Sequence, residues 1–373
     1  MHERWIADRV KQIEVSGIRK VFELAAHLKD PVNLSIGQPH FPVPAPIKEA
    51  AKVAIDQDKS GYTLTQGISE LRSRLLADVR GRYPSNADRE LVVTSGTSGG
   101  LVLALSCILN PGDDVIIFDP YFVMYPHFIT LAGGRSTIVD TSPDFRIDVG
   151  KVEAAITPRT KAIIANSPAN PTGVVHDRET LCDLAELARS RNILMMSDEV
   201  YRAFCYDMPF ASPLEFNDDT LVLDGFSKAY GMTGWRLGYA HGPRRLIEEM
   251  TKLQQFTYVC APSLVQYAGV AACDVDIAPI VADYRRKRDR LVGALRGLYE
   301  LVEPGGAFYV FPKAPWGTGS EFVAEAIRNN LLVIPGSAFS RHDTHFRISY
   351  AVSDAILDRG IDILRRLAKQ GQV

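Results

Sequence analysis

Residues 193–201 read ILMMSDEVY, and residues 221–228 read LVLDGFSK. In both stretches a short apolar run, which predicts a buried strand, passes directly into polar residues that include Asp198, Tyr201 and Lys228. In open α/β sheets, ligands bind outside the carboxyl ends of the strands. These two stretches therefore predict a sheet and also a site at one edge of it.

Similar apolar runs occur at 91–94, 115–118 and 162–165. The first runs into SGTSGG at 95–100, and the third into NSPANPTG at 166–173. Between the runs lie amphipathic stretches, such as 178–190, that predict helices. Strands that alternate with helices indicate a mostly parallel sheet between two layers of helices, an α/β fold.

The C-terminal part has a different pattern. A charged helix is predicted at 278–298 and another at 321–329, with strand-like runs at 331–334 and 346–350 and a final amphipathic helix. This pattern predicts a smaller α+β unit. Near the N-terminus, Pro39, Pro42, Pro44 and Pro46 predict an extended segment, not a helix, that crosses between the units. We expect a large domain at 44–282 and a small domain formed by 1–43 and 283–373.

Composition excludes several classes of protein. The 373 residues are 46% hydrophobic and 23% charged, which is typical of a globular chain and not of a disordered one. Lys and Arg total 42 against 44 Asp and Glu, so no basic excess indicates a nucleic-acid or membrane partner. The five cysteines are isolated and form no metal-binding spacing, so we expect no metal and a reducing, cytoplasmic location.

Two features indicate the chemistry. The small, hydroxyl-rich loop at Gly96, Thr97 and Ser98 precedes a helix, and backbone N–H groups at a helix start favour phosphate binding. Lys228 follows a strand and lies eight residues before Arg236 in a glycine-rich segment. A partly buried lysine can act as an amine nucleophile, and an arginine fork can hold a phosphate. The loop matches neither nucleoside-triphosphate nor dinucleotide fingerprints.

These residues resemble class I aminotransferases, which are fold-type I enzymes that use pyridoxal 5′-phosphate. The resemblance covers nearly the whole chain, and it implies that the mostly parallel sheet between the helices is of the seven-stranded type. It rests on short motifs in the family's order and spacing: IGQP at 36–39, GY at 61–62, GISELR at 67–72, NPTG at 170–173, DEVY at 198–201, SK at 227–228, RLG at 236–238 and RISY at 347–350.

The resemblance implies a role for each of these residues toward the cofactor. Lys228 would hold it covalently and then move protons, Asp198 would contact its ring nitrogen, and Asn170 and Tyr201 would bind its phenolic oxygen. Phe122 would stack on its ring, with Tyr121 as the competing residue. The phosphate would be bound by a further set: Gly96, Thr97, Ser98, Ser227 and Arg236. The family often has a phosphate-binding serine three residues before the lysine, where this chain has Gly225.

The resemblance also implies the substrate contacts. Arg347 would clamp the substrate α-carboxylate, and Gly37 would offer it a backbone N–H. Tyr62 would reach the phosphate of the neighbouring subunit, which implies a homodimer with shared active sites. Near the N-terminus, where the family usually has Gly-Glu-Pro-Asp, this chain has Gly37-Gln38-Pro39-His40. Whether His40 faces the substrate is therefore open.

The resulting hypothesis is an aminotransferase that moves an amino group from an L-amino acid to a 2-oxo acid by ping-pong chemistry. Two alternatives stay open: a carbon–sulfur β-lyase on the same scaffold, and a ligand-sensing domain without catalysis. In one branch of the family a lysine in the phosphate loop binds the distal carboxylate of aspartate, and Ser98 occupies that position here. We therefore expect a neutral or aromatic donor, with Tyr258 as one possible contact.

Overall fold

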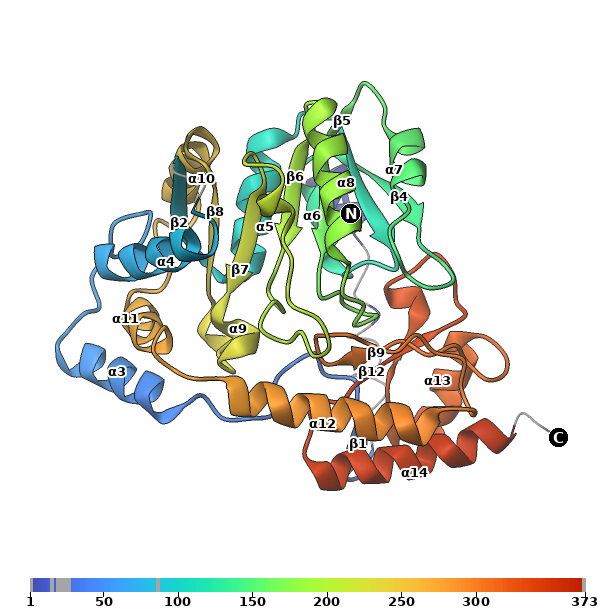
Figure 1. Cartoon of the computed structure of the whole chain (residues 1–373). Coiled ribbons are helices and arrows are strands. Elements are labelled where there is room, and N and C mark those ends of the chain that lie inside the picture. Colours follow the sequence, from blue (N-terminus) through green and yellow to red (C-terminus); the bar gives the residue numbers. More distant parts are fainter. Residues whose placement is uncertain (1–2, 14–16, 18–27, 85–87, 371–373) are drawn as a thin grey trace.

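A seven-stranded sheet forms the centre of the computed structural model, which describes residues 3–13, 17, 28–84 and 88–370 (Figure 1). Across the sheet the strand order is β2-β8-β7-β6-β5-β3-β4, and only β8 runs antiparallel to its neighbours. The strands are β2 (Arg89–Ser95), β3 (Asp114–Asp119), β4 (Arg135–Asp140), β5 (Thr160–Asn166), β6 (Leu194–Asp198), β7 (Leu221–Gly225) and β8 (Leu237–Pro243). The predicted α/β class is confirmed.

Five of these strands were predicted from their apolar runs, and two were not. β4 lies at the edge of the sheet and is only partly buried, so it has no continuous apolar run. β8 is interrupted by Gly238 and Gly242. A Cβ atom at Gly238 would lie 2.5 Å from the Thr97 backbone nitrogen, so the close approach of two backbones explains the break in the pattern.

Helices cover both faces of the sheet (Figure 1). Within β3, Val115 and Ile117 pack in one apolar cluster while Ile116 packs in another, as the alternation of side chains along a strand requires. The first face carries α5 (Gly96–Ile108), α6 (Met124–Leu131) and α10 (Arg244–Thr257). The second carries α7 (Val149–Ala155) and α8 (Arg178–Ser190), and further along α3 (Ala45–Asp56), α4 (Ser69–Arg82) and α11 (Ser263–Ala272).

The C-terminal elements pack beside the sheet around their own apolar cluster (Figure 1). Two small sheets form there, one of β1 with β10 and one in the order β11-β12-β9. The elements are β1 (Val32–Asn33), α12 (Ala278–Leu295), β9 (Tyr309–Val310), α13 (Gly319–Arg328), β10 (Leu331–Leu332), β11 (Ile334–Pro335), β12 (Phe346–Ser349) and α14 (Asp354–Gln370). Elsewhere in the described chain, or between these elements, lie six short helices: η1 (Glu3–Trp5), α1 (Asp8–Lys11), η2 (Pro213–Glu215), α9 (Phe226–Ala229), η3 (Thr233–Trp235) and η4 (Gly336–Ala338).

Two details of the sequence prediction were wrong. Pro46 lies inside the first turn of α3 and not in an extended segment, because the first turn of a helix does not use the backbone N–H that proline lacks. The helix predicted to run to Leu298 ends at Leu295, two residues before Gly297 takes a φ of 78°. The division into domains at 44–282 and at 1–43 with 283–373 stays a prediction.

The packing of Gly238 leads to a stability prediction. We expect Gly238→Ala to lower the free energy of unfolding by about 1–3 kcal/mol, because the added methyl group meets the backbone of residues 96 and 97. Gly293→Ala is the control, since its Cβ atom would meet nothing within 4 Å and its exposed position lies inside α12. It should raise stability by about 0.5–1 kcal/mol. Denaturant titration of both variants measures this, and equal effects would contradict the packing argument.

Candidate active site

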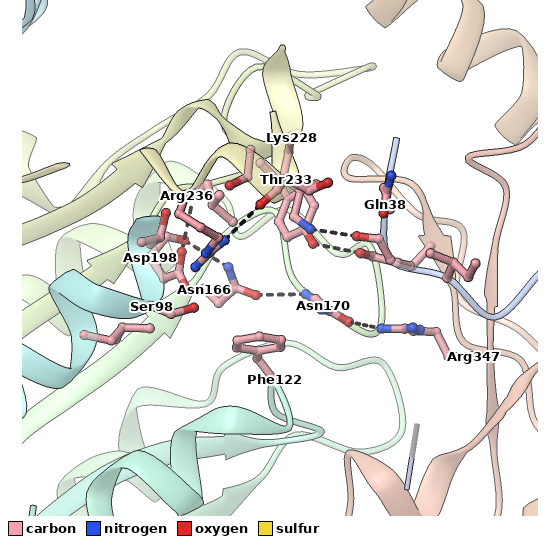
Figure 2. A pocket seen from close by; sticks show the side chains of 18 residues that line it. Gln38, Ser98, Phe122, Asn166, Asn170, Asp198, Lys228, Thr233, Arg236 and Arg347 are labelled. Atoms are coloured by element: carbon pink, nitrogen blue, oxygen red, sulfur yellow. Dashed lines mark hydrogen bonds between the residues drawn. The ribbon is translucent and has the colours of Figure 1, made fainter. Parts of the chain in front are cut away.

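A cavity of about 370 Å³ opens at the carboxyl ends of β5, β6 and β7, next to the start of α5 (Figure 2). Segments from across the chain close it: the N-terminal segment supplies Gly37, β9 supplies Tyr309, and β12 supplies Arg347. The full lining is Ile36, Gly37, Gln38, Thr97, Ser98, Leu101, Phe122, Asn166, Asn170, Asp198, Val200, Tyr201, Ser227, Lys228, Thr233, Arg236, Tyr309 and Arg347.

One end of the cavity is built to hold an anion. Thr97 and Ser98 lie in the first turn of α5, whose backbone N–H groups and dipole favour negative charge. The Arg236 guanidinium donates to the carbonyl oxygen of Thr233 at 3.1 Å and lies against Gly96. A Cβ atom at Gly96 would lie 2.5 Å from an Arg236 nitrogen, so only glycine leaves room for the guanidinium here. Hydroxyls, backbone N–H groups and one arginine together fit a phosphate.

Gly225 also serves this end of the cavity, although it does not line it. A Cβ atom at Gly225 would lie 2.8 Å from the Thr97 hydroxyl oxygen. The Thr97 hydroxyl donates to the carbonyl oxygen of Asp224 at 3.2 Å. The space of a serine side chain at 225 is therefore occupied by Thr97, while Ser227 lines the cavity.

Lys228 enters the cavity from α9, a single helical turn that follows β7. Its Nζ donates to the carbonyl oxygen of Gly37 at 2.6 Å, a contact between residues 191 positions apart. Burial, together with the positive charges of Arg347 and Arg236, lowers the pKa of Lys228 to about 8. A substantial fraction of this amine is therefore neutral near physiological pH, as a nucleophile or proton acceptor requires.

Asp198 ends β6 and is 3% exposed. Its Oδ2 accepts a hydrogen bond from the Tyr125 hydroxyl at 2.6 Å, and its Oδ1 accepts the Val200 N–H at 3.4 Å. Burial raises the pKa of Asp198 to about 6, against the lowering effect of these two hydrogen bonds. A carboxylate in this state favours a protonated nitrogen as its partner, because a positive charge would offset the cost of burial.

Arg347 is 2% exposed and lies between two aromatic rings, with its Cζ 4.6 Å from the ring centroids of both Tyr309 and Phe339. Its terminal nitrogens donate to Asn170 Oδ1 at 2.9 Å and to the carbonyl oxygen of Ser35 at 2.7 Å. Its Nε is buried and has no partner among the described residues. A guanidinium that is fixed in this way and lines the cavity suits a carboxylate ligand.

Aromatic side chains shape the space between these charges. Phe122 and Lys228 approach the cavity from opposite sides (Figure 2). The hydroxyl groups of Tyr201 and Tyr309 are hydrogen bonded at 2.7 Å, and the Tyr201 ring lies 5.8 Å from Lys228 Nζ. The result is a cavity with a lysine, a carboxylate, two arginines and aromatic rings around it, which fits a planar anionic ring compound.

Most of the residues predicted from the sequence come together here. The lining includes Gly37, Thr97, Ser98, Phe122, Asn170, Asp198, Tyr201, Ser227, Lys228, Arg236 and Arg347. Gly96 lies directly behind, against Arg236. Tyr62 does not line the cavity of this chain and is 87% exposed. Tyr121 and Tyr258 lie outside the lining, and His40 contacts Tyr284 and Lys287 instead.

Three residues that hydrogen bond to predicted site residues were not assigned a role from the sequence. Tyr125 bonds Asp198 from α6, Tyr309 bonds Tyr201 from β9, and Asn166 accepts the Asn170 N–H at 2.8 Å while donating to the Asp198 carbonyl at 2.9 Å. Asn166 stands at the end of β5, so its place after an apolar run was a usable signal. Tyr125 and Tyr309 sit among other aromatic and apolar residues, and nothing in their surroundings separates them from core residues.

Comparison with known proteins agrees with this geometry. A family model described as aminotransferase class I and II matches residues 29–364. The chain is 37% identical to a probable aspartate aminotransferase of Methanocaldococcus jannaschii, over 97% of this chain and 99% of that protein. It is also 37% identical to a probable N-acetyl-LL-diaminopimelate aminotransferase of Bacillus subtilis, over 97% and 95% of the two chains.

Among solved structures, an aspartate aminotransferase from Thermus thermophilus with maleate superposes with a TM-score of 0.91. It is 34% identical, and the match covers 97% of this chain and 99% of that one. The fold and site thus define an enzyme of the pyridoxal-phosphate-dependent transferase class. The chain belongs to the aminotransferase class I and II family.

The described part of the chain contains neither a cluster of potential metal ligands nor a membrane-spanning helix. No group of three or more His, Cys, Asp or Glu side chains there could hold a metal ion. Likewise, no helix within the described ranges is long and apolar enough to cross a membrane.

The burial of Asp198 has a consequence for stability. The folded protein binds a proton at Asp198 more tightly than the unfolded chain does, because the pKa rises from 3.8 to about 6. Above the folded-state pKa of Asp198, the ionised carboxylate therefore lowers the free energy of unfolding. Below the pKa of the unfolded chain, the carboxyl is protonated in both states and has no such effect. In the cofactor-free protein, Asp198→Asn should be more stable than the wild type by roughly 3 kcal/mol above pH 6, and equal to it at low pH.

Asp177→Ala is the matched control for this pH experiment. Asp177 caps α8, and hydrogen bonding from the Thr180 backbone lowers the pKa of its carboxyl. Its contribution is present above the unfolded pKa and is lost as pH falls, so the variant should be destabilised at neutral pH and match the wild type in acid. Thermal melts across pH measure both. A neutral-pH loss of stability for Asp198→Asn would contradict the cost assigned to its buried charge.

Proposed function

We propose that this chain binds pyridoxal 5′-phosphate in the cavity at the ends of β5, β6 and β7 and uses it to transfer amino groups. The observation that carries the proposal is the placement of Lys228 and Asp198 in one buried slot, beside an anion site at the start of α5. Lys228 would hold the cofactor covalently, and Asp198 would face its ring nitrogen. The phosphate would be held by Gly96, Thr97, Ser98, Ser227 and Arg236.

Further residues would orient the cofactor and the substrate. Phe122 would lie on the ring face, and Asn170 and Tyr201 would donate to the phenolic oxygen. Arg347 and the backbone N–H of Gly37 would bind the substrate α-carboxylate. The position of the Arg347 guanidinium in the cavity lining, held between two aromatic rings, supports this role.

The bound cofactor would supply an electron sink for the electron pair left when the substrate loses its Cα proton. The protein's own part is proton transfer and alignment. With a pKa of about 8, Lys228 Nζ can accept the Cα proton near neutral pH and later return it. Asp198 would keep the ring nitrogen protonated, because its buried negative charge gains a positive partner.

We propose that the active enzyme is a homodimer with shared sites. Tyr62 is predicted to reach the phosphate of the neighbouring subunit, and its 87% exposure in the single chain supports a role outside its own cavity. Leu64, two residues on, is 57% exposed, which leaves an apolar surface next to it for a partner to cover. A cytoplasmic location is proposed from the five free, isolated thiols.

We further propose that the preferred donor has an uncharged side chain. The cations in the described lining of the cavity are Lys228, Arg236 and Arg347, and each already has a role toward cofactor or α-carboxylate. A distal carboxylate would then be buried without a partner from this chain, which costs roughly 2–5 kcal/mol. The relatives' names include aspartate and N-acetyl-LL-diaminopimelate aminotransferases, so family membership alone does not select the donor.

The attachment point is tested by reduction with borohydride and mass spectrometry of the peptides. We expect a pyridoxyl group on Lys228, and we expect Lys228→Ala to lower turnover by several orders of magnitude, because the anchor and the proton acceptor are both lost. Lys161→Ala serves as the control, since that lysine is exposed on β5. A pyridoxyl group on another lysine would overturn the assignment.

The donor preference is tested by kcat/KM for aspartate, alanine, methionine, phenylalanine and kynurenine with one common acceptor. Aspartate should be disfavoured by more than tenfold, as the cost of an unpaired carboxylate implies. Aspartate leading the panel by tenfold would contradict the proposed donor class. Release of pyruvate and ammonia without an acceptor would instead indicate a carbon–sulfur β-lyase, and cofactor binding with no turnover of any donor would indicate a ligand sensor.

A further inference from the structure

A partly buried ion pair lies behind the candidate active site, with Asp224 buried and the Arg202 side chain 30% exposed. The carboxylate of Asp224, near the end of β7, accepts hydrogen bonds from Arg202 Nε at 2.5 Å and from the Tyr239 hydroxyl at 2.8 Å, both on Oδ2. Its Oδ1 accepts the Gly225 N–H at 2.6 Å. Asp224 is 5% exposed, so its charge is held by the protein and not by water.

This carboxylate links three parts of the site without touching the cavity. Arg202 follows Tyr201 in the chain, and Asp224 lies four residues before Lys228. The backbone carbonyl of the same aspartate accepts the Thr97 hydroxyl at 3.2 Å. One residue therefore connects the tyrosine turn, the lysine and the anion site, yet neither Arg202 nor Asp224 is among the residues that line the cavity.

The link matters because α9 cannot hold its own position. It has only four residues, and its N-cap residue Gly225 provides no side-chain cap. A helix of one turn has no stability of its own in water, so its orientation depends on what its ends are tied to. Its residues Ser227 and Lys228 face the site, while Phe226 and Ala229 line a second cavity of about 320 Å³ behind it.

We propose that Arg202 and Asp224 are positioning residues, whose ion pair holds α9 and thus Lys228 in register with Tyr201 and with the anion site. This inference rests on the proposed role of Lys228 as the cofactor-bearing residue. The pair also balances charge close to Asp198, because the Arg202 guanidinium neutralises a second buried carboxylate there.

Other charged and titratable groups face Asp224 from the elements packed around it. They are Asp198 and Glu199 at the end of β6, Tyr230 after α9, and Tyr239 of β8. Asp78 and Arg82 of α4 face the other member of the pair, Arg202. Asp78 also contacts Arg202, with 3.7 Å between its Oδ2 and an Arg202 terminal nitrogen. The salt bridge to Asp224 is made by Arg202, through its Nε and the Oδ2 of the carboxylate.

A double-mutant cycle on the holoenzyme tests the proposal. Arg202→Met leaves the Asp224 charge uncompensated, so the pH midpoint of the cofactor's visible absorption should rise by about half to one unit. Asp224→Asn leaves the arginine uncompensated, so the midpoint should fall by a similar amount. Each single variant should lose about tenfold or more in kcat, since a displaced lysine reacts poorly. In the double variant, the absorption midpoint and kcat should both lie closer to the wild-type values than in either single variant.

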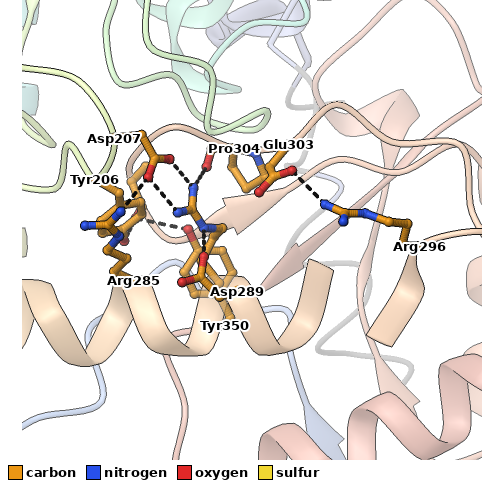
Figure 3. Close-up of polar contacts among 10 residues, drawn as sticks. Tyr206, Asp207, Arg285, Asp289, Arg296, Glu303, Pro304 and Tyr350 are labelled. Atoms are coloured by element: carbon orange, nitrogen blue, oxygen red, sulfur yellow. Dashed lines mark hydrogen bonds and ion pairs between the residues drawn. The ribbon is translucent and has the colours of Figure 1, made fainter. Parts of the chain in front are cut away.

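Arg288→Met is the matched control. The Arg288 side chain is 3% exposed and donates to Asp207 Oδ2 at 2.6 Å and to the carbonyl oxygen of Pro304 at 2.7 Å. Figure 3 shows Asp207 and Pro304 above α12, and Arg288 is not among the residues that line the active-site cavity. This variant also breaks a partly buried ion pair. It should lower the melting temperature while leaving the cofactor's absorption midpoint unchanged.

Two milder variants keep the test usable if the first ones do not fold. Tyr239→Phe removes one donor to Asp224 and should shift the midpoint upward by less than Arg202→Met does. Arg202→Lys keeps the charge but loses the guanidinium geometry, so it should restore the midpoint and only part of kcat.

Several results would overturn the proposal. They are single variants that lose only melting temperature, as the control does, single variants that shift the midpoint in the same direction, and mild variants indistinguishable from wild type. Peptide mapping of the reduced wild-type enzyme separates a failure of this positioning proposal from a failure of the proposed function. If the pyridoxyl group is not on Lys228, the function assignment fails first.

Discussion

The site depends on the burial of one negative charge. Asp198 lies at the end of a central strand, where it is almost fully excluded from water and has one hydroxyl and one backbone N–H as direct donors. Such a carboxylate is costly in the empty protein, as its raised pKa indicates. A protonated ring nitrogen would remove that cost, so the same feature that weakens the empty fold would strengthen binding of the cofactor.

The sheet topology places this charge opposite the others. Parallel strands bring the carboxyl ends of β5, β6 and β7 to one edge, and α5 begins at the same edge because β2 is parallel to β7 across the antiparallel β8. The N-terminal segment and β12 then close the cavity from the C-terminal side of the molecule. Lys228 bonds to Gly37 and Arg347 bonds to Ser35, so the N-terminal segment is held by two of the cationic residues of the site.

The sequence predicted those parts of the structure that have a local signal. Apolar runs that end in polar residues located β5, β6 and β7 together with Asn170, Asp198 and Lys228, because strand ends and function coincide in this class of fold. β8 escaped prediction because Gly238 and Gly242 interrupt the apolar pattern, and Gly238 is required by close contact with the backbone of residues 96 and 97.

Long-range contacts explain the rest of what was missed. Tyr125 reaches Asp198 across 73 residues, and Tyr309 reaches Tyr201 across 108. Their partners are set by how helices and small sheets pack on the main sheet, and neither side chain stands next to a recognisable motif. The same holds for Arg202 and Asp224, which adjoin site residues in the chain but whose pairing depends on the spacing of β6 and β7.

The most direct test of this account is nuclear magnetic resonance of the holoenzyme with pyridoxal 5′-phosphate labelled with ¹⁵N in its ring. If the buried Asp198 carboxylate is the partner of that nitrogen, the ¹⁵N shift will report a protonated ring from mildly acidic to mildly alkaline pH, and Asp198→Asn will lose this protonation. A ring nitrogen that is unprotonated above neutral pH in the wild-type enzyme would contradict the account.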